Sequence, residues 1–223
     1  MKIREHALSI FFGAIFLAAL AGQSIAGLIV FNDEQLAHSQ PTIGWIDFVT
    51  SSDFVVDVAE NWQSEYLQFF LFIAATIWLV QKGSPESKKP GHEGLGTHKE
   101  QLLGRYARAD SPAWAKATGF RRWLLSNSLL LVMGTIFVLS WLAQALAGVT
   151  VHNADQVAHG EAPISLGEYM LSAEFWNRTL QNWQSEFLAV GSMVVLAIVL
   201  RQRGSAESKP VGAPNSVGAI ESE

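Results

Sequence analysis

The sequence predicts an all-α membrane protein with four transmembrane helices, arranged as two tandem parallel two-helix repeats. Three observations lead to this fold class. Apolar residues make up 49% of the 223 residues and lie in long blocks. The pentapeptide Asn-Trp-Gln-Ser-Glu occurs twice, at positions 61–65 and 182–186. Nearly all of the basic residues lie in three segments: the N-terminus, the centre and the tail.

Four apolar blocks define the predicted spans. Residues 7–31 and 124–151 contain no ionisable side chain, and each block exceeds the roughly 20 residues that a helix needs to cross a bilayer. Blocks 66–80 and 187–200 reach this length only if their helices continue back through the repeated pentapeptide. The predicted spans are therefore about 7–31, 62–81, 124–151 and 183–202. The first block is not interpreted as a cleaved signal, because an internal block matches it.

A constant spacing of 121 residues relates the two repeats. It aligns Gln23 with Gln144, His38 with His159, and Glu65 with Glu186. It also aligns the motif residues Asn61, Trp62, Gln63 and Ser64 with Asn182, Trp183, Gln184 and Ser185. Such a long shared register indicates tandem duplication. The predicted organisation is a first repeat at 1–89, a cytoplasmic linker at 90–121, a second repeat at 122–210 and a disordered tail at 211–223.

The distribution of charge predicts the orientation. Of the 15 Lys and Arg residues, 14 lie in the N-terminus, the central segment 82–122 or the tail, and Arg178 is the exception. The other two loops and the helix starts that follow them hold 12 of the 20 carboxylates. The positive-inside rule then places both termini and the linker in the cytoplasm and the two acidic loops on the other side.

The two outer loops are predicted to contain amphipathic interfacial helices. Pro41 and Pro163 end the preceding helices, and large apolar side chains then alternate with acids. In the second loop, Ser165 and Glu168 have the spacing of a capping box, which predicts a helix start there.

A polar set near the predicted outer boundary supplies the candidate functional residues: His38, Glu65, His159, Glu186, Gln23 and Gln144. Ionisable groups within a membrane are functional candidates by default. A structural role is the favoured interpretation, because a Glu in the first turn of a helix and a His at its end both complement the helix dipole. His38 and His159, with the two Glu residues, form a ligand set that suits a transition metal or haem. No cofactor is predicted, and a metal or haem site is kept as the alternative.

Several functional classes receive no support from the sequence. The chain has no cysteine, which removes disulfides and thiolate metal ligands. It contains no nucleophile elbow, phosphate-binding loop, dinucleotide fingerprint or zinc-protease motif. The basic residues are explained by topology, so no nucleic-acid partner is expected. These observations favour a protein without catalytic activity.

Three patterns occur in both repeats: N-x-x-Q-x-A-H, then NWQSE-[YF]-L, then Q-[KR]-G-S-x-E-S-K. Together they resemble an uncharacterised family of small bacterial integral membrane proteins, known as a domain of unknown function. The resemblance implies four helices in a bacterial inner membrane and carries over no activity. We therefore expect a protein in the lipid bilayer that moves or senses a small solute or ion. The other expectation is an accessory subunit that forms a homo-oligomer or binds a membrane partner protein.

Overall fold

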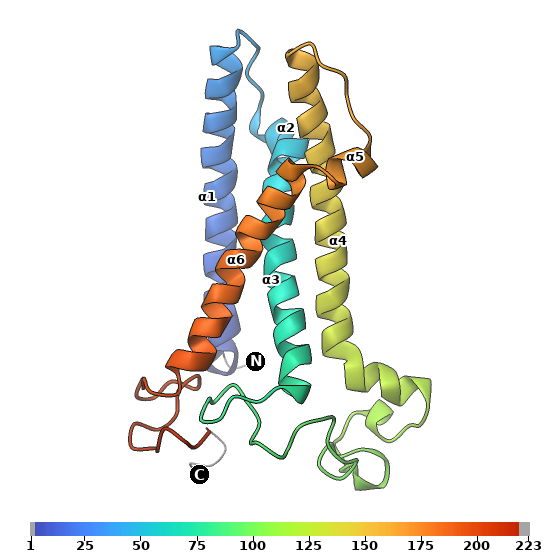
Figure 1. Ribbon diagram of the computed structural model, residues 1–223, viewed down its shortest axis with the longest axis vertical. Helices are drawn as coiled ribbons and strands as arrows, with labels where there is room; N and C mark the ends of the chain where they lie inside the picture. The colour runs from blue at the N-terminus through green and yellow to red at the C-terminus, as the bar shows by residue number, and fades with distance from the viewer. Residues whose placement is uncertain (1–2, 219–223) are drawn as a thin grey trace. The chain divides into compact units, whose positions relative to one another are not determined.

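The computed structural model describes residues 3–218, and within this range it contains helices and connecting segments but no β-strand (Figure 1). The all-α prediction is thus confirmed. The elements are η1 (Ile3–His6), α1 (Ala7–Ala37), α2 (Trp45–Val49), α3 (Ser52–Trp78), η2 (Gly104–Tyr106), η3 (Ala113–Ala115), α4 (Phe120–Ala158), α5 (Leu166–Met170) and α6 (Ala173–Leu196).

The chain divides into two compact units. Unit 1 comprises Met1–Ala59 and Leu142–Phe175, and unit 2 comprises Glu60–Trp141 and Trp176–Glu223. Helices α3, α4 and α6 each contribute residues to both units.

Helices α1 and α4 are long enough and apolar enough to cross a membrane. They contain 31 and 39 residues, or about 46 Å and 58 Å at 1.5 Å per residue, against a hydrocarbon core of about 30 Å. Both helices extend beyond the predicted spans through the N-x-x-Q-x-A-H pattern. They end at Ala37 and Ala158, so that His38 is the C-cap residue of α1.

The chain that follows each long helix is fastened to it by an asparagine. Asn32 accepts a hydrogen bond from the backbone nitrogen of Ile43 (2.9 Å) and donates one to the carbonyl oxygen of Ile43 (3.1 Å). Asn153 makes the same two bonds with Ile164, at 2.8 Å and 2.9 Å. The same pair of bonds therefore forms at positions 121 residues apart.

In each connection, one buried aromatic side chain packs against two other aromatic rings of unit 1. In the first, Phe48 contacts Phe31 and Phe54, with ring centroids 5.7 Å and 5.5 Å apart. In the second, Tyr169 contacts His152 and Phe175 at 5.5 Å and 5.6 Å. These are matching positions, and Phe48 and Tyr169 are 3% and 1% exposed.

The predicted amphipathic helices are shorter than their loops. Helices α2 and α5 have five residues each, and the remaining apolar and acidic residues form the first turns of α3 and α6. The predicted capping box is present: the Ser165 hydroxyl accepts from the Glu168 nitrogen, and Glu168 accepts from the Ser165 nitrogen.

Helices α3 and α6 begin earlier and end earlier than the sequence indicates. They start at Ser52 and Ala173, because no helix-breaking residue separates these points from the NWQSE motif. They end at Trp78 and Leu196 rather than near 81 and 202. After α3, the backbone nitrogen of Gly94 bonds to the Ile77 oxygen (2.7 Å). After α6, the chain continues in turns, in which Arg201 Nη1 bonds to the oxygens of Ile198 (2.9 Å) and Leu200 (2.8 Å).

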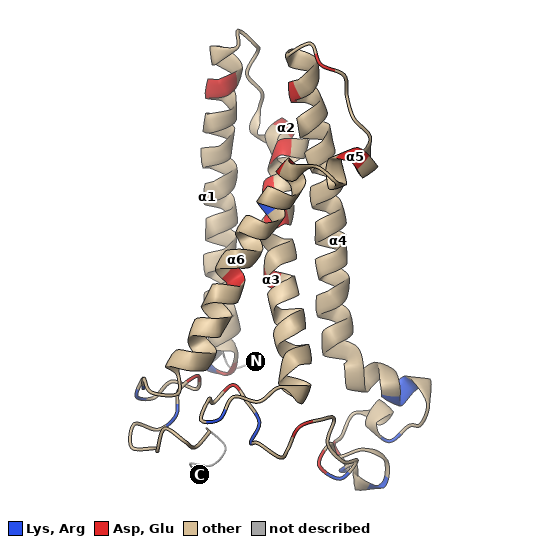
Figure 2. Ribbon diagram, in the orientation of Figure 1, with Lys and Arg blue, Asp and Glu red and all other residues tan. Residues whose placement is uncertain are grey.

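The charged residues follow the helices in a regular way (Figure 2). Lys and Arg lie before α1, between the end of α3 and the first turns of α4, and after α6, apart from Arg178 within α6. Where the sequence predicts a disordered tail from residue 211, residues 211–218 form turns and accept hydrogen bonds. Positions 219–223 of that predicted tail lie outside the described residues.

Candidate functional site

The two NWQSE motifs bond to one another within unit 2. Gln63 of α3 is fully buried, and its Oε1 accepts a hydrogen bond of 2.8 Å from Trp183 Nε1 of α6. Its Nε2 donates to the carbonyl oxygen of Glu60 at 3.1 Å. Both polar atoms of the Gln63 side chain therefore have a hydrogen-bond partner within the protein.

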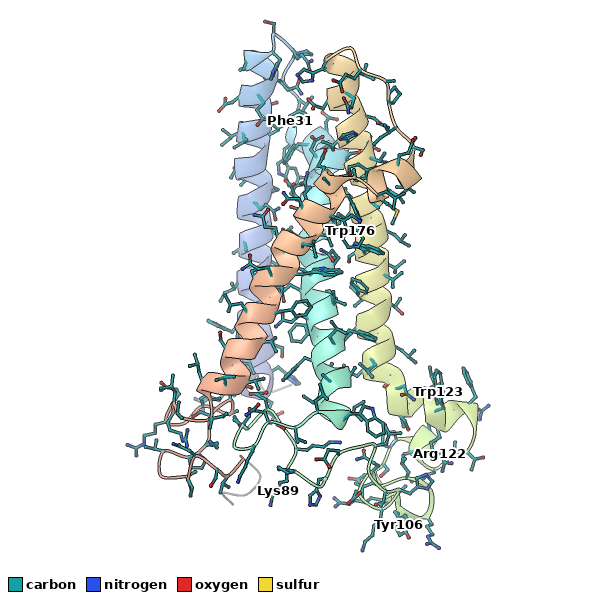
Figure 3. The ribbon with its side chains drawn as sticks, in the orientation of Figure 1. Phe31, Lys89, Tyr106, Arg122, Trp123 and Trp176 are labelled. Atoms are coloured by element: carbon teal, nitrogen blue, oxygen red, sulfur yellow. The ribbon has the colours of Figure 1, made fainter. Side chains whose placement is uncertain are left out.

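The Trp183 ring is the first of three indole rings in a row. Trp176, labelled in Figure 3, lies edge-on to Trp183 with centroids 6.4 Å apart, and Trp141 of α4 lies 6.2 Å from Trp176. An indole ring buries a large apolar area and still offers an N–H donor. The rings thus join α4 to α6 within unit 2, and the Gln63–Trp183 hydrogen bond joins α6 to α3.

The serines of the motifs bond to their own helices. Ser64 Oγ donates to the Asn61 oxygen (2.8 Å), and Ser185 Oγ donates to the Asn182 oxygen (2.9 Å). This satisfies a hydroxyl in apolar surroundings without a partner from another helix. The motifs differ in burial, since Ser64 is 2% exposed whereas Ser185 is exposed. Exposed positions are also occupied by Asn61, Trp62 and Gln184, whereas Asn182 is half-buried and donates to the Arg178 oxygen.

The one basic residue outside the three basic segments has a carboxylate partner. Arg178 Nε lies 2.7 Å from Glu60 Oε2, and both side chains are largely buried, at 29% and 18% exposed. The matching positions 121 residues away hold Asp57 and Gln181. Because glutamine is uncharged, the matching positions cannot form the same ion pair. The Glu60 carboxylate compensates the charge of Arg178, which explains why a single arginine is tolerated within α6.

The candidate carboxylates Glu65 and Glu186 lie deep within their helices. Each is thirteen residues after the first residue of its helix, Ser52 or Ala173. The expectation that they occupy first turns is therefore wrong, and the helix dipole does not account for them. The Glu65 side chain is exposed and that of Glu186 is half-buried.

The candidate histidines bond to the ends of their own helices. His38 Nδ1 donates to the Glu34 oxygen and His159 Nδ1 to the Asp155 oxygen, each at 2.9 Å, and both rings are exposed. Of the paired glutamines, Gln23 is exposed and Gln144 is 1% exposed. Among the described residues, no three His, Asp or Glu side chains are grouped so that they could hold a metal ion.

Sequence reasoning missed a polar cluster at His152. Its Nδ1 lies 2.7 Å from Glu174 Oε2, and its Nε2 accepts a 3.2 Å hydrogen bond from the Gln156 amide. The matching residues of the first repeat are Phe31, Asp53 and Gln35. The sequence signal for this cluster was an ionisable residue, His152, at a position that matches an aromatic residue, Phe31.

The Q-[KR]-G-S-x-E-S-K patterns form two motif loops, residues 81–88 and 202–209. In the first, Ser87 Oγ accepts from the Gln81 nitrogen (2.7 Å) and donates to the Lys88 oxygen (3.1 Å). In the second, Ser208 makes the matching bonds with Gln202 (2.8 Å) and Lys209 (3.1 Å). The motif thus encodes a turn that is closed by its own serine.

The lysine that ends each motif loop bonds to the chain that follows it. Lys88 Nζ donates to the Gly94 oxygen (2.6 Å), and Lys209 Nζ donates to the oxygen of Asn215 (3.2 Å), the matching residue. Lys209 also bonds to the oxygens of Gly83 (2.6 Å) and Val217 (2.9 Å) and is 1% exposed. Burial, and to a smaller extent the charge of Arg201, lowers the pKa of Lys209.

A cavity of about 380 Å³ lies beside the first motif loop. Its wall includes Ser84 and Lys88 of that loop, Lys89 and Glu100 of the linker, and Ser216 of the tail. A second hollow, of about 330 Å³, follows the last turns of α6 and includes Met193 and Ser205. Both lie within unit 2, and both use residues of the Q-[KR]-G-S-x-E-S-K pattern.

The chain matches no curated protein and no solved structure in these comparisons. A protein-family model does match residues 1–219, which cover both NWQSE motifs and both motif loops. Its description is a domain of unknown function (DUF6766). The chain therefore belongs to the DUF6766 family.

Proposed function

We propose that this chain is a multi-pass bacterial inner-membrane protein of four spans that senses a small solute and catalyses no reaction. The main observation behind the proposal is that the two kinds of repeated motif have different surroundings. Gln63 and Trp183 bond to each other inside the protein, whereas the motif loops, on the predicted cytoplasmic side, border a cavity.

The exposure of the two long helices supports the membrane assignment. In the most apolar parts of α1 and α4, 6% and 17% of the residues are buried in the protein. An apolar helix in a water-soluble protein hides such a surface in a core, whereas a helix in lipid exposes it.

Helices α3 and α6 complete the four proposed spans. About 20 residues are needed for a crossing, and counting back from Trp78 and Leu196 brings both NWQSE motifs into the span. Polar side chains within the hydrocarbon must be paired internally. The Gln63–Trp183 hydrogen bond and the Glu60–Arg178 ion pair provide this pairing.

The proposed tandem duplication explains why bonds recur at a spacing of 121 residues. Asn32 and Asn153 fasten their connections in the same way, and the two motif loops are closed by the same serine bonds. Two crossings per repeat give both repeats the same orientation, with both termini and the linker in the cytoplasm.

A second candidate function is the movement of a small ion along the helices. The positions of Glu65 and Glu186 within the proposed spans and the burial of Gln144 favour this alternative. Ionisable groups inside a membrane are costly, and they mark ion pathways in many membrane proteins.

Single cysteines test the topology, because the chain has none of its own. Ser39→Cys, between α1 and α2, should react with a membrane-impermeant maleimide in cells whose outer membrane alone has been permeabilised. Ser111→Cys, in the linker, should react after the inner membrane is also opened. Labelling of Ser111→Cys before that step would refute the proposed orientation.

Ion flux in proteoliposomes separates sensing from movement. We expect the protein to conduct protons, sodium and potassium no faster than protein-free vesicles do, as judged with ion-sensitive dyes. A flux that is lost in Glu65→Gln with Glu186→Gln would replace the sensing proposal with the pathway. The Glu93→Gln variant, in the linker, is the control.

A further inference from the structure

The cavity beside the first motif loop has the size of a small-molecule site. Its volume of about 380 Å³ falls in the range of roughly 300–1,000 Å³ typical of ligand pockets. Its wall is built from two parts of the chain that are far apart in sequence: residues 83–101, which run from the first motif loop into the linker, and the tail through Ser216 and Gly218.

Basic groups outnumber acidic groups on this wall. Lys88, Lys89 and His92 line the cavity, with Glu100 as the acid among its lining residues (Figure 3 labels Lys89). Lys88 Nζ is fixed by the Gly94 oxygen at 2.6 Å, so that its charge is held in place at the wall. A cationic ligand would face three basic groups, whereas an anion would be attracted to them.

The acid on the wall is already engaged. Glu100 Oε2 accepts hydrogen bonds from the backbone nitrogen (2.6 Å) and the hydroxyl (2.9 Å) of Thr97. These bonds lower the pKa of Glu100, and the charges of His92 and Lys88 lower it further. The carboxylate is thus hydrogen-bonded within its own loop, and the cavity lining contains more basic than acidic side chains.

The remaining wall is a C-terminal strap, residues 210–218. Lys209 Nζ holds it through the oxygens of Asn215 (3.2 Å) and Val217 (2.9 Å), and Arg201 Nη2 holds it through the oxygen of Ala213 (3.0 Å). Lys209 Nζ also bonds to Gly83 of the first motif loop (2.6 Å). The strap is therefore docked on the loop that forms the opposite wall.

We propose that this cavity binds a small anion bearing a carboxylate or phosphate group, which Lys89 and His92 recognise and the C-terminal strap encloses. This inference rests on the proposed sensing function and names the class of solute that is sensed. The anion has two possible sources, a soluble metabolite or the headgroup of an anionic lipid, and both would meet the same basic groups.

Thermal unfolding of the full-length protein in a neutral detergent tests the proposal. Sodium citrate or sodium phosphate should raise the Tm relative to sodium chloride at equal ionic strength. Lys89→Gln with His92→Gln should weaken the apparent affinity at least about tenfold, as expected for the loss of charge-assisted hydrogen bonds. The matched control is Lys99→Gln with His98→Gln, which removes the same residue types from linker positions outside the cavity lining and should leave the affinity unchanged.

Lipid nanodiscs distinguish the two sources. A Tm that rises with phosphatidylglycerol over phosphatidylcholine, but not with citrate or phosphate, assigns the site to a lipid headgroup. The reverse assigns it to a soluble anion. A chain ending at Lys209, which lacks the strap, should lose the response in either case.

Two results would overturn the inference. One is a Tm that responds to neither soluble anions nor phosphatidylglycerol. The other is a response that persists in Lys89→Gln with His92→Gln. Either result leaves the sensing proposal to be judged by cysteine labelling and flux, because those measurements do not involve the cavity.

Discussion

At the scale of single residues, two glycines allow buried rings to approach the long helices. A Cβ at Gly148 would lie 2.5 Å from Tyr169 Oη and 2.9 Å from Tyr169 Cε1, and one at Gly27 would lie 2.9 Å from Phe48 Cζ. Both rings are buried and also contact a second aromatic residue, so neither can move aside cheaply. The lack of a side chain at Gly27 therefore lets Phe48 of α2 pack against α1. The lack of one at Gly148 lets Tyr169 of α5 pack against α4.

We predict that Gly148→Ala lowers the free energy of unfolding by about 1–3 kcal/mol, the usual cost of overpacking a filled site. Gly27→Ala should act in the same direction. Gly13→Ala and Gly22→Ala are the controls, because no described atom lies within 4 Å of the added Cβ. They should be neutral or slightly stabilising, since alanine is the better helix former. Thermal unfolding in detergent is the measurement, and equal stability of Gly148→Ala and Gly22→Ala would contradict the contact.

At the scale of elements, the two short helices start differently. Helix α5 has the Ser165–Glu168 capping box, whereas the matching N-cap of α2 is Gly44, which has no side chain to offer. Hydrogen bonds from the backbone and side chain of Ser165 lower the pKa of Glu168. A carboxyl whose pKa is lowered by folding stabilises the fold above its ordinary range, and that contribution disappears as the pH falls through the lowered value.

We therefore predict that amide protection in α5 decreases on acidification below the ordinary carboxyl range, and that Glu168→Gln removes this dependence. Ser165→Ala should destabilise the helix start by about 1 kcal/mol, the typical value of an N-cap. Hydrogen exchange of the α5 amides reports both effects, with Asp47→Asn in α2 as the matched control. Unchanged exchange in Ser165→Ala would mean that the cap does not hold α5.

The two motif loops present a like-charged pair with the opposite pH dependence. Burial raises the pKa of Glu86, and the charge of Glu207 and the hydrogen bond that protonated Glu86 donates to it raise the pKa further. Glu86 and Glu207 are matching residues of the two loops. Because the folded state then holds the proton more tightly than the unfolded state, stability falls as the pH rises through the raised pKa.

Glu86→Gln should accordingly flatten the dependence of Tm on pH in the window just above the ordinary carboxyl range. Glu93→Gln is the control, because hydrogen bonds from Gly91 and from its own backbone lower the pKa of Glu93. Its removal should leave the wild-type slope in that window intact. If Glu86→Gln keeps that slope too, the two loops do not share a proton.

At the scale of the whole molecule, several contacts in unit 2 join residues more than 100 positions apart. Trp183 donates to Gln63, Arg178 pairs with Glu60, and Lys209 donates to the Gly83 oxygen. Each contact joins a residue that precedes the linker to one that follows it, and all lie outside the linker. Contacts outside the linker therefore hold these groups together.

A split chain tests this arrangement. Fragments ending at Gly96 and beginning at Thr97, produced together, should co-purify in mild detergent. Replacing Arg178 and Trp183 with Ala and Phe should reduce the recovery of the untagged fragment severalfold, because both inter-repeat bonds are lost. Separate elution of the unmodified fragments would show that the linker is required for assembly.

The sequence predicted the elements whose physics is local. Long apolar blocks indicated α1 and α4, and the spacing of Ser165 and Glu168 indicated the start of α5. The bounds of α3 and α6 were predicted less well. The last turn of α3 bonds to Gly94 across a loop whose path was not readable from residue types. The positions of Glu65 and Glu186 in their helices were misjudged because these helices begin before the NWQSE motifs, at Ser52 and Ala173.

What the sequence determined by itself was the all-helical class, the register of 121 residues and the uneven distribution of charge, since each depends on residue type and spacing alone. Tertiary structure decided which of the repeated residues meet. Equal motifs occupy unequal surroundings: Gln63 is buried against Trp183, whereas Gln184 is exposed. One chain contains both repeats, so each motif has neighbours that differ from those of its counterpart, and burial depends on those neighbours. The cavity, too, is lined by two segments that are far apart in the sequence, residues 83–101 and the tail at Ser216 and Gly218, which only folding brings together.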